Sequence, residues 1–421
     1  MIRVIIDDQT LRLIQGLAVT MNIDRFRKCN LNLRVWPALA LVALGCGGGG
    51  GGSQSTNDPP VLKPNVVIAG SGIEVVSSDE NSVVVSGNAS VIAPGTTLVS
   101  GTGPGLLRKV VSVTPSGSNT LLGTSQGALE DVFESANISE QVSMGADEVE
   151  DFEPALPGVT LDSPSLAPGR SETSIKLTLH EVTLEQEGSA KISVSGSIVF
   201  TIDVRLVYRV PQNYVEIVAT IDGSADATLK ASLSKSFADR KWLLGTLKSK
   251  PLIIMAGPVP IVLVPKLDIY SALDGSLKLG ASVTGSSSYS LRLGAFKSDV
   301  DMGGIGSLSH EEHLTQTPNF YGSCEFRYTP LRVDLGVFLY GVAGPYVKAE
   351  IPGFDLTFAQ KTNPAGKQIT LGGGFTGSAG LKLKMFNHAS LDYEFPNVIN
   401  TRFDILDQFF PDNGGVDVEV K

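Results

Sequence analysis

A serine nucleophile is the first chemistry that the residue types suggest. Gly123-Thr-Ser-Gln-Gly127 matches G-x-S-x-G, in which a serine on a sharp strand-to-helix turn attacks a carbonyl carbon. Residues 128–134 follow, and their period predicts a short helix. However, the other βα units of a hydrolase fold are missing from the sequence, and a tight turn with Ser125 beside the helix start explains the same residues. We therefore predict a protein that is not an enzyme, with a secreted serine hydrolase as an alternative.

Two pairs of residues have types that could bind a metal ion. Asp299 and Asp301 precede Gly303, as at the start of a calcium loop, but the third ligand and the closing glutamate are absent. His310 and His313 are three residues apart, a spacing that a divalent cation could use on one helical turn. A solvated polar loop explains both pairs. We therefore predict no cofactor, with Ca²⁺ or Zn²⁺ at these four residues as the alternative.

The remaining histidines, His180 and His388, and Cys324 indicate no catalytic chemistry. His180 and His388 have no acid–base partner nearby in the sequence, and we interpret both as ordinary surface or packed residues. Cys324 shares its strand phase with Phe326 and Tyr328, which predicts a buried free thiol.

The N-terminal region indicates covalent lipid attachment at Cys46. Basic residues between positions 25 and 34 precede the charge-free run Val35–Gly45, which is typical of a secretory signal and too short for a membrane-spanning helix. Residues Val42-Ala-Leu-Gly-Cys46 resemble the lipobox of bacterial prolipoproteins, with leucine one place closer to the cysteine than is usual. This resemblance implies cleavage between Gly45 and Cys46 and attachment of acyl chains such as palmitate to the cysteine.

The residues around Cys46 also predict a location. By resemblance to enterobacterial lipoproteins, Gly47 in place of aspartate implies transport to the outer membrane, where three acyl chains make a stable anchor. Residues 46–64 contain a run of six glycines and a Pro-Pro pair, which predicts a tether. A signal peptide that begins at Met21 and covers 21–45 has the usual length, so we interpret residues 1–20 as an over-extended gene start.

Composition limits the class of the remaining chain. The 421 residues carry a net charge of −10, and no basic stretch follows the signal region, so we predict no nucleic-acid partner. Three cysteines cannot build a disulfide scaffold, and the 46 glycines favour β structure over a helical bundle.

Residues 65–146 are predicted to form a small β unit with one short helix. Short Val/Ile-rich runs alternate with turn residues at close spacing, which is typical of antiparallel strands. The segment 105–133 resembles a small module of large exported bacterial proteins, and this resemblance implies no assigned activity. Residues 147–172 are rich in acids and prolines and lack a period, so we interpret them as a linker.

Residues 173–421 contain unusually long alternations of apolar and polar residues, at 192–208, 215–233, 261–283, 331–339 and 369–385. Each alternation predicts a strand with one buried face, and the first two predict a hairpin. We therefore predict an all-β, mainly antiparallel fold with an elongated long-stranded β-sandwich or half-closed sheet, in which Pro265 and the glycines mark bends or bulges. The same alternation fits a transmembrane barrel, which the lipobox and the lack of obvious aromatic girdles disfavour.

Together these features predict an exported lipoprotein with a binding or structural role at the bacterial cell envelope. Its lipid would hold it on the outer membrane, facing the periplasm or the cell surface, where an envelope protein could be its partner. As an alternative, the long sheet could enclose an apolar trough that carries a lipid or other hydrophobic ligand. The face of the 261–283 strand would then be hollow.

Overall fold

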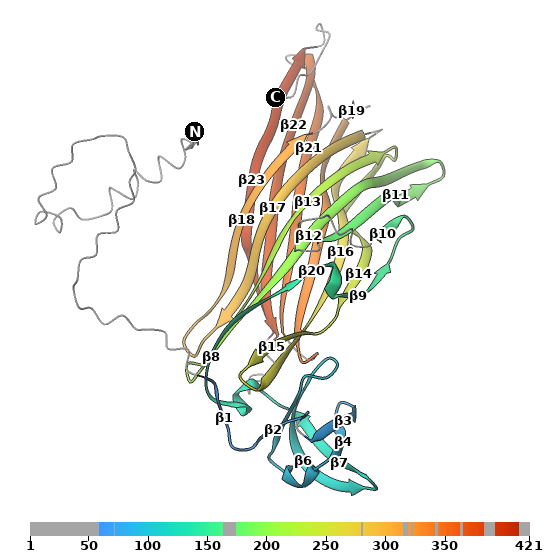
Figure 1. Ribbon diagram of the computed structural model, residues 1–421. Coiled ribbons are helices and arrows are strands. Elements are labelled where there is room, and N and C mark those ends of the chain that lie inside the picture. The colour runs from blue at the N-terminus through green and yellow to red at the C-terminus, as the bar shows by residue number, and fades with distance from the viewer. Residues whose placement is uncertain are drawn as a thin grey trace, which may run out of the picture. The chain divides into compact units, whose positions relative to one another are not determined.

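The computed structural model describes residues 59–70, 72–162, 174–278, 281–314, 319–320, 323–341, 344–362, 365–382 and 392–411. These described residues belong to one compact unit. Its fold is all-β and mainly antiparallel, as the alternations predict, and β2 with β5 is a parallel pair. Within the described ranges the strands form sheets of nine, eight and six strands (Figure 1).

The strands of each sheet have the following bounds. The nine-stranded sheet contains β1 (Val61–Leu62), β8 (Phe133–Met144), β10 (Val159–Asp162), β11 (Ile175–Glu187), β12 (Ala190–Val210), β13 (Tyr214–Ala231), β17 (Ala281–Lys297), β18 (Met302–Leu314) and β19 (Asn319–Phe320). The eight-stranded sheet contains β9 (Val149–Pro154), β14 (Lys235–Ser249), β15 (Leu252–Ala256), β16 (Val259–Lys278), β20 (Ser323–Leu339), β21 (Pro345–Thr362), β22 (Ala365–Lys382) and β23 (Asp392–Pro411). The six-stranded sheet contains β2 (Val66–Ile68), β3 (Ile73–Ser78), β4 (Ser82–Gly87), β5 (Thr97–Ser100), β6 (Leu106–Ser116) and β7 (Asn119–Gln126). Three short 3₁₀ turns lie between strands, at η2 (Ala89–Val91), η3 (Leu129–Asp131) and η4 (Ala146–Glu148).

The predicted long hairpin is β12 with β13, paired from Ile192 opposite Ala231 to Arg209 opposite Tyr214. Along β12 the alternation sorts the side chains onto two faces, so that Ile202 is fully buried while Arg205 is exposed. The same alternation applies to β16, whose buried side chains belong to the large core. In β16, Ile261, Leu263, Leu267 and Ile269 are fully buried, whereas Val264 is only partly buried. The strand predicted over 261–283 is two strands in the structure, because β16 ends at Lys278 and residues 281–283 begin β17.

The two large sheets share one hydrophobic core. Leu291 and Leu293 of β17 belong to the same cluster of contacting side chains as Leu267 of β16 and Phe375 of β22. Over its described residues, the face that a carrier would expose to a ligand is therefore packed against other apolar side chains.

Small residues bring the two large sheets together where β18 meets β23. Gly304 and Gly306 of β18 are themselves exposed and lie opposite the buried Ala295 and Leu293 of β17. A Cβ atom at Gly306 would lie only 2.6 Å from a methyl carbon of Val398 on β23. Glycine therefore allows this close approach, because any larger residue would collide with the facing strand.

Pro265 lies inside β16 at a place where its missing N–H has little effect. On one side of β16, pairing with β15 ends at Leu263, and pairing with β14 begins at Lys266. Val264 and Pro265 thus lie at the gap between two neighbouring strands, where a ladder hydrogen bond is not required.

The six-stranded sheet is buried on both faces along β5 and β6. Leu98 and Leu106 belong to its own small core, whereas Val99 and Leu107 belong to the large core shared by the other sheets. The alternation of adjacent residues along these two strands therefore joins the small sheet to the large ones.

Two predicted elements have a different form in the structure. The helix predicted over residues 128–134 is only the 3₁₀ turn η3, in which the Asp131 side chain accepts a hydrogen bond from the Ala128 N–H at 3.0 Å. Phe133 is already the first residue of strand β8. Its ring is buried, and its backbone and that of the residues after it pair with neighbouring strands. The described part of the predicted linker 147–172 forms β9 and β10, which pair with β14 and β11.

Candidate functional site

Ser125 lies within strand β7, not on a strand-to-helix turn. It pairs with Lys109 of β6, and its side chain is exposed. The 3₁₀ turn η3 starts four residues later at Leu129. This is the ordinary position of a strand residue, and it lacks the sharp turn that raises a nucleophilic serine above a sheet.

Asp299 and Asp301 lie in the turn between β17 and β18, and each accepts a hydrogen bond from another residue. The Asn213 side-chain amide donates to Asp299 Oδ1 at 2.9 Å, and the Met302 N–H donates to Asp301 Oδ1 at 2.8 Å. Asp299 thereby connects its own turn to the β12–β13 turn that contains Asn213. In the part of the chain that the structure describes, no group of three or more histidine, cysteine, aspartate or glutamate side chains could hold a metal ion.

His310 and His313 are in strand β18, opposite Tyr289 and Ser286 of β17. The two residues are therefore in a strand and not on the helical turn for which their spacing would suit a divalent cation. The His310 ring lies 4.7 Å from the ring of Phe375 on the facing sheet, and burial lowers the pKa of its imidazole. His310 is therefore a packing residue between sheets.

The other residues singled out in the sequence do not gather into a site. His180 is exposed in β11, where its backbone N–H donates to the carbonyl oxygen of Gly158. Cys324 pairs with Leu277 and Phe358 in the eight-stranded sheet, in the strand phase of the buried Phe326. Gly45, Cys46 and His388 lie outside the described residues.

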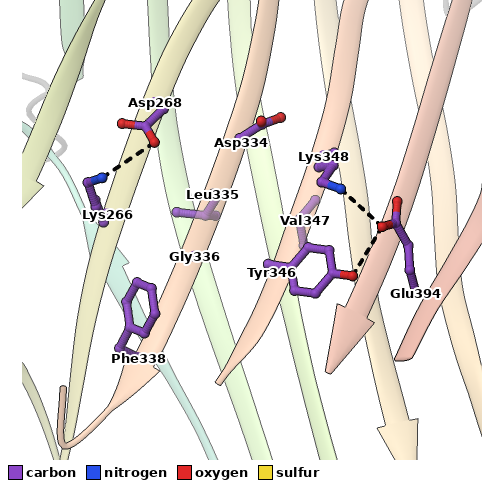
Figure 2. A pocket seen from close by; sticks show the side chains of 10 residues that line it. All are labelled: Lys266, Asp268, Asp334, Leu335, Gly336, Phe338, Tyr346, Val347, Lys348 and Glu394. Atoms are coloured by element: carbon purple, nitrogen blue, oxygen red, sulfur yellow. Dashed lines mark hydrogen bonds and ion pairs between the residues drawn. The ribbon is translucent and has the colours of Figure 1, made fainter. Parts of the chain in front are cut away.

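A pocket of about 420 Å³ lies on the outer face of the eight-stranded sheet (Figure 2). Its lining residues come from four strands, β16, β20, β21 and β23, of which only β20 and β21 are consecutive in the sequence. We call this pocket the outer groove; its rim consists of Lys266, Asp268, Asp334, Phe338, Tyr346, Lys348 and Glu394. Its volume is within the range of small-molecule sites, about 300 to 1,000 Å³.

Strand register explains why these side chains meet. Lys266, Gly336 and Tyr346 are direct neighbours across β16, β20 and β21. Two residues along the strands, a second row places Asp268 beside Asp334 and Asp334 beside Lys348. Because each row lies two residues from the next on the same face, the rim groups all point outward while Leu335 and Val347 point into the core.

Two side chains of the rim, the rings of Phe338 and Tyr346, lie over glycine backbone. Figure 2 shows the backbone at Gly336 between the rings of Phe338 and Tyr346. A Cβ atom at Gly336 would lie 2.9 Å from the Phe338 ring, and one at Gly380 would lie 2.3 Å from the Tyr346 ring. Both rings therefore lie over bare backbone, which leaves flat aromatic surface next to the hollow.

Most of the charges around the groove are paired. Glu394 accepts hydrogen bonds from Lys348 Nζ at 3.0 Å, Ser378 Oγ at 3.0 Å and Tyr346 Oη at 3.1 Å. These bonds, that from Lys348 above all, lower the pKa of Glu394. On the opposite side, Asp268 accepts from Thr246 Oγ1 at 2.7 Å and from Lys266 Nζ at 3.4 Å.

Asp334 differs from the other carboxylates of the groove. Its Oδ1 atom is shielded from solvent and has no hydrogen-bond partner among the described residues. Burial raises the pKa of Asp334, against the opposing charges of Arg332 and Lys348. Asp334 is therefore a half-buried carboxyl group with hydrogen-bonding capacity to spare, at the edge of an open pocket.

The groove is not predictable from the sequence, because its residues come from strands whose order and register depend on the whole fold. One signal was present within the 331–339 alternation. Its polar phase contains Arg332, Asp334 and Gly336, and then Phe338. An aromatic residue in the solvent-facing phase next to a glycine indicates a surface that is not merely solvated.

No family model, curated protein or solved structure matches this chain significantly. Within the described residues, the helical segments are too short to cross a membrane.

Proposed function

We propose that this chain is an exported, lipid-anchored protein of the bacterial cell envelope with a binding or structural role. The order of basic residues, charge-free run, Gly45-Cys46 and glycine tether carries the proposal, because lipoprotein export requires these features in this order. The body attached to this tether is an all-β unit with an extensive packed core. Such a body suits presentation of a surface at the end of a membrane anchor.

The position of Ser125 supports a binding role over a hydrolytic one. A serine nucleophile requires a strained turn and a base within hydrogen-bond reach. Ser125 is instead an exposed residue in a regular antiparallel pair with Lys109.

The anchor is tested by labelling the precursor in a bacterial host with an alkyne analogue of palmitate. We expect the wild-type chain to be labelled and Cys46→Ser to lose the label completely, since the serine oxygen does not form the thioether. Cys29→Ser and Cys324→Ser are matched controls that should retain full labelling. Label that persists in Cys46→Ser would contradict the proposal.

The same cells decide the gene start and the exposed face. A precursor accumulated with a signal-peptidase inhibitor should begin at Met21, and a mass that fits Met1 would reject the over-extended start. Protease added to intact cells should then separate the two orientations, because only a surface-exposed body would be digested.

A further inference from the structure

The outer groove has the properties of a binding site for a small polar ligand with apolar faces. Its two rings, Phe338 and Tyr346, are partly exposed and lie over bare backbone at Gly336 and Gly380 respectively. Flat aromatic surface of this kind binds the C–H faces of a ring-shaped ligand, while an alkyl chain would need a deeper apolar channel.

The polar rim presents both signs of charge. Lys266 and Lys348 supply donors, while Asp268, Asp334 and Glu394 supply acceptors. A polyanion would be repelled by three carboxylates, and a polycation by the two ammonium groups. A neutral ligand with several hydroxyl groups can satisfy both kinds of partner, because each hydroxyl donates and accepts.

Asp334 identifies the position where the ligand is held. Its Oδ1 atom has no partner among the described residues, and its direct neighbour across the strands, the carboxylate of Asp268, has no hydrogen to donate. Because Oδ1 is shielded from solvent, a ligand hydroxyl reaches it only when the carboxyl group rotates about its terminal torsion toward the groove, and it would then provide the missing hydrogen bond. Charge-assisted hydrogen bonds of this type are about twice as strong as neutral ones.

We propose that the outer groove binds a pyranose ring of an oligosaccharide, with Phe338 and Tyr346 against its C–H face and Asp334 accepting from its hydroxyl groups. This inference goes beyond the proposed anchoring, which would determine only where the glycan is encountered.

The test is titration calorimetry on the purified full chain in a detergent without a sugar headgroup. The probes are four neutral tetrasaccharides: those of β-1,4-linked N-acetylglucosamine, β-1,4-linked glucose, α-1,4-linked glucose and β-1,4-linked mannose. We expect at least one to bind in the millimolar range or tighter. Absence of heat with all four would overturn the proposal.

Variants locate the bound sugar. Asp334→Asn and Phe338→Leu should each weaken binding at least about tenfold, through a lost charged acceptor and a lost aromatic face respectively. Gly336→Thr should abolish it, because its Cβ would lie 2.9 Å from the Phe338 ring and would push that ring out of place. Asp226→Asn, an exposed carboxylate on the nine-stranded sheet, is the matched control and should leave affinity within about twofold.

Affinity that is unchanged in Asp334→Asn and Phe338→Leu would also overturn the proposal, because the sugar would then be bound elsewhere. If Gly336→Thr does not fold, these two conservative variants still decide. Cys46→Ser should bind the sugar like the wild type, so a failure of the anchor and a failure of the groove are distinguished.

Discussion

At the scale of single residues, Glu130 is a carboxyl group whose surroundings differ strongly from water. It lies in η3 with its Oε2 atom buried and without a hydrogen-bond partner among the described residues. Burial chiefly raises the pKa of Glu130 to about 7, the charge of Asp131 adds to this, and Lys297 and Lys63 oppose it. The neutral form of Glu130 is thus the one that fits the folded chain.

This environment predicts that the free energy of unfolding falls as pH rises. Because the pKa of Glu130 is higher in the folded state than its ordinary 4.5, the folded state holds the proton more tightly. Its stabilising effect is fully present below about pH 4.5 and is lost as pH rises through about 7, by at most about 3 kcal/mol.

Glu130→Gln should therefore be more stable than the wild type at pH 8, with a flatter dependence between pH 5 and 8, in urea denaturation. Glu134→Gln, an exposed neighbour in β8, should keep the wild-type profile. A Glu130→Gln curve that stays parallel to the wild type over this range would refute the assignment.

At the scale of elements, the junction of β18 and β23 depends on glycines that lie against β23. Gly306→Val should lower the free energy of unfolding by about 1 to 3 kcal/mol, because its Cβ would lie 2.6 Å from Val398 and 2.8 Å from Ile399 and must push the strands apart. Ser307→Val is the matched control. It adds a β-branched residue at the adjacent exposed position and should change stability by less than about 0.5 kcal/mol.

Thermal unfolding followed by circular dichroism measures both variants. Equal melting temperatures for Gly306→Val and Ser307→Val would show that the two sheets do not need this close approach.

At the scale of the whole folded unit, β5 and β6 predict that the small sheet unfolds together with the large ones. Leu107 contributes to the large core although it belongs to the six-stranded sheet. Leu107→Ala should cost about 2 to 5 kcal/mol and should lower a single calorimetric transition. Leu121→Ala, at an exposed position of β7, should have little effect. Two separate transitions, of which only the smaller moves with Leu107→Ala, would mean that the sheets unfold independently.

The long strands were predictable because their pattern is local. Alternation with a period of two specifies which face of β12 and β13 is buried, and their short connection leaves an antiparallel hairpin as the natural pairing. The helix predicted at 128–134 was wrong because that prediction also rested only on neighbouring residues, and here the local pattern fits two structures. Leu129, Val132 and Phe133 also suit a turn that leads into a strand, and only the pairing of β8 with β12 selects that form.

The groove and the buried carboxyl of Glu130 are properties of the tertiary structure alone. Asp268 and Asp334 are neighbours because β16 pairs with β20, and Glu394 joins them through two further strands. Sequence by itself determined the all-β class, the long one-faced strands and the expectation of a lipid anchor at Cys46, since each follows from residues adjacent in the chain. The tertiary structure decided which outward side chains meet, because strand order and register depend on the burial of the whole sheet at once.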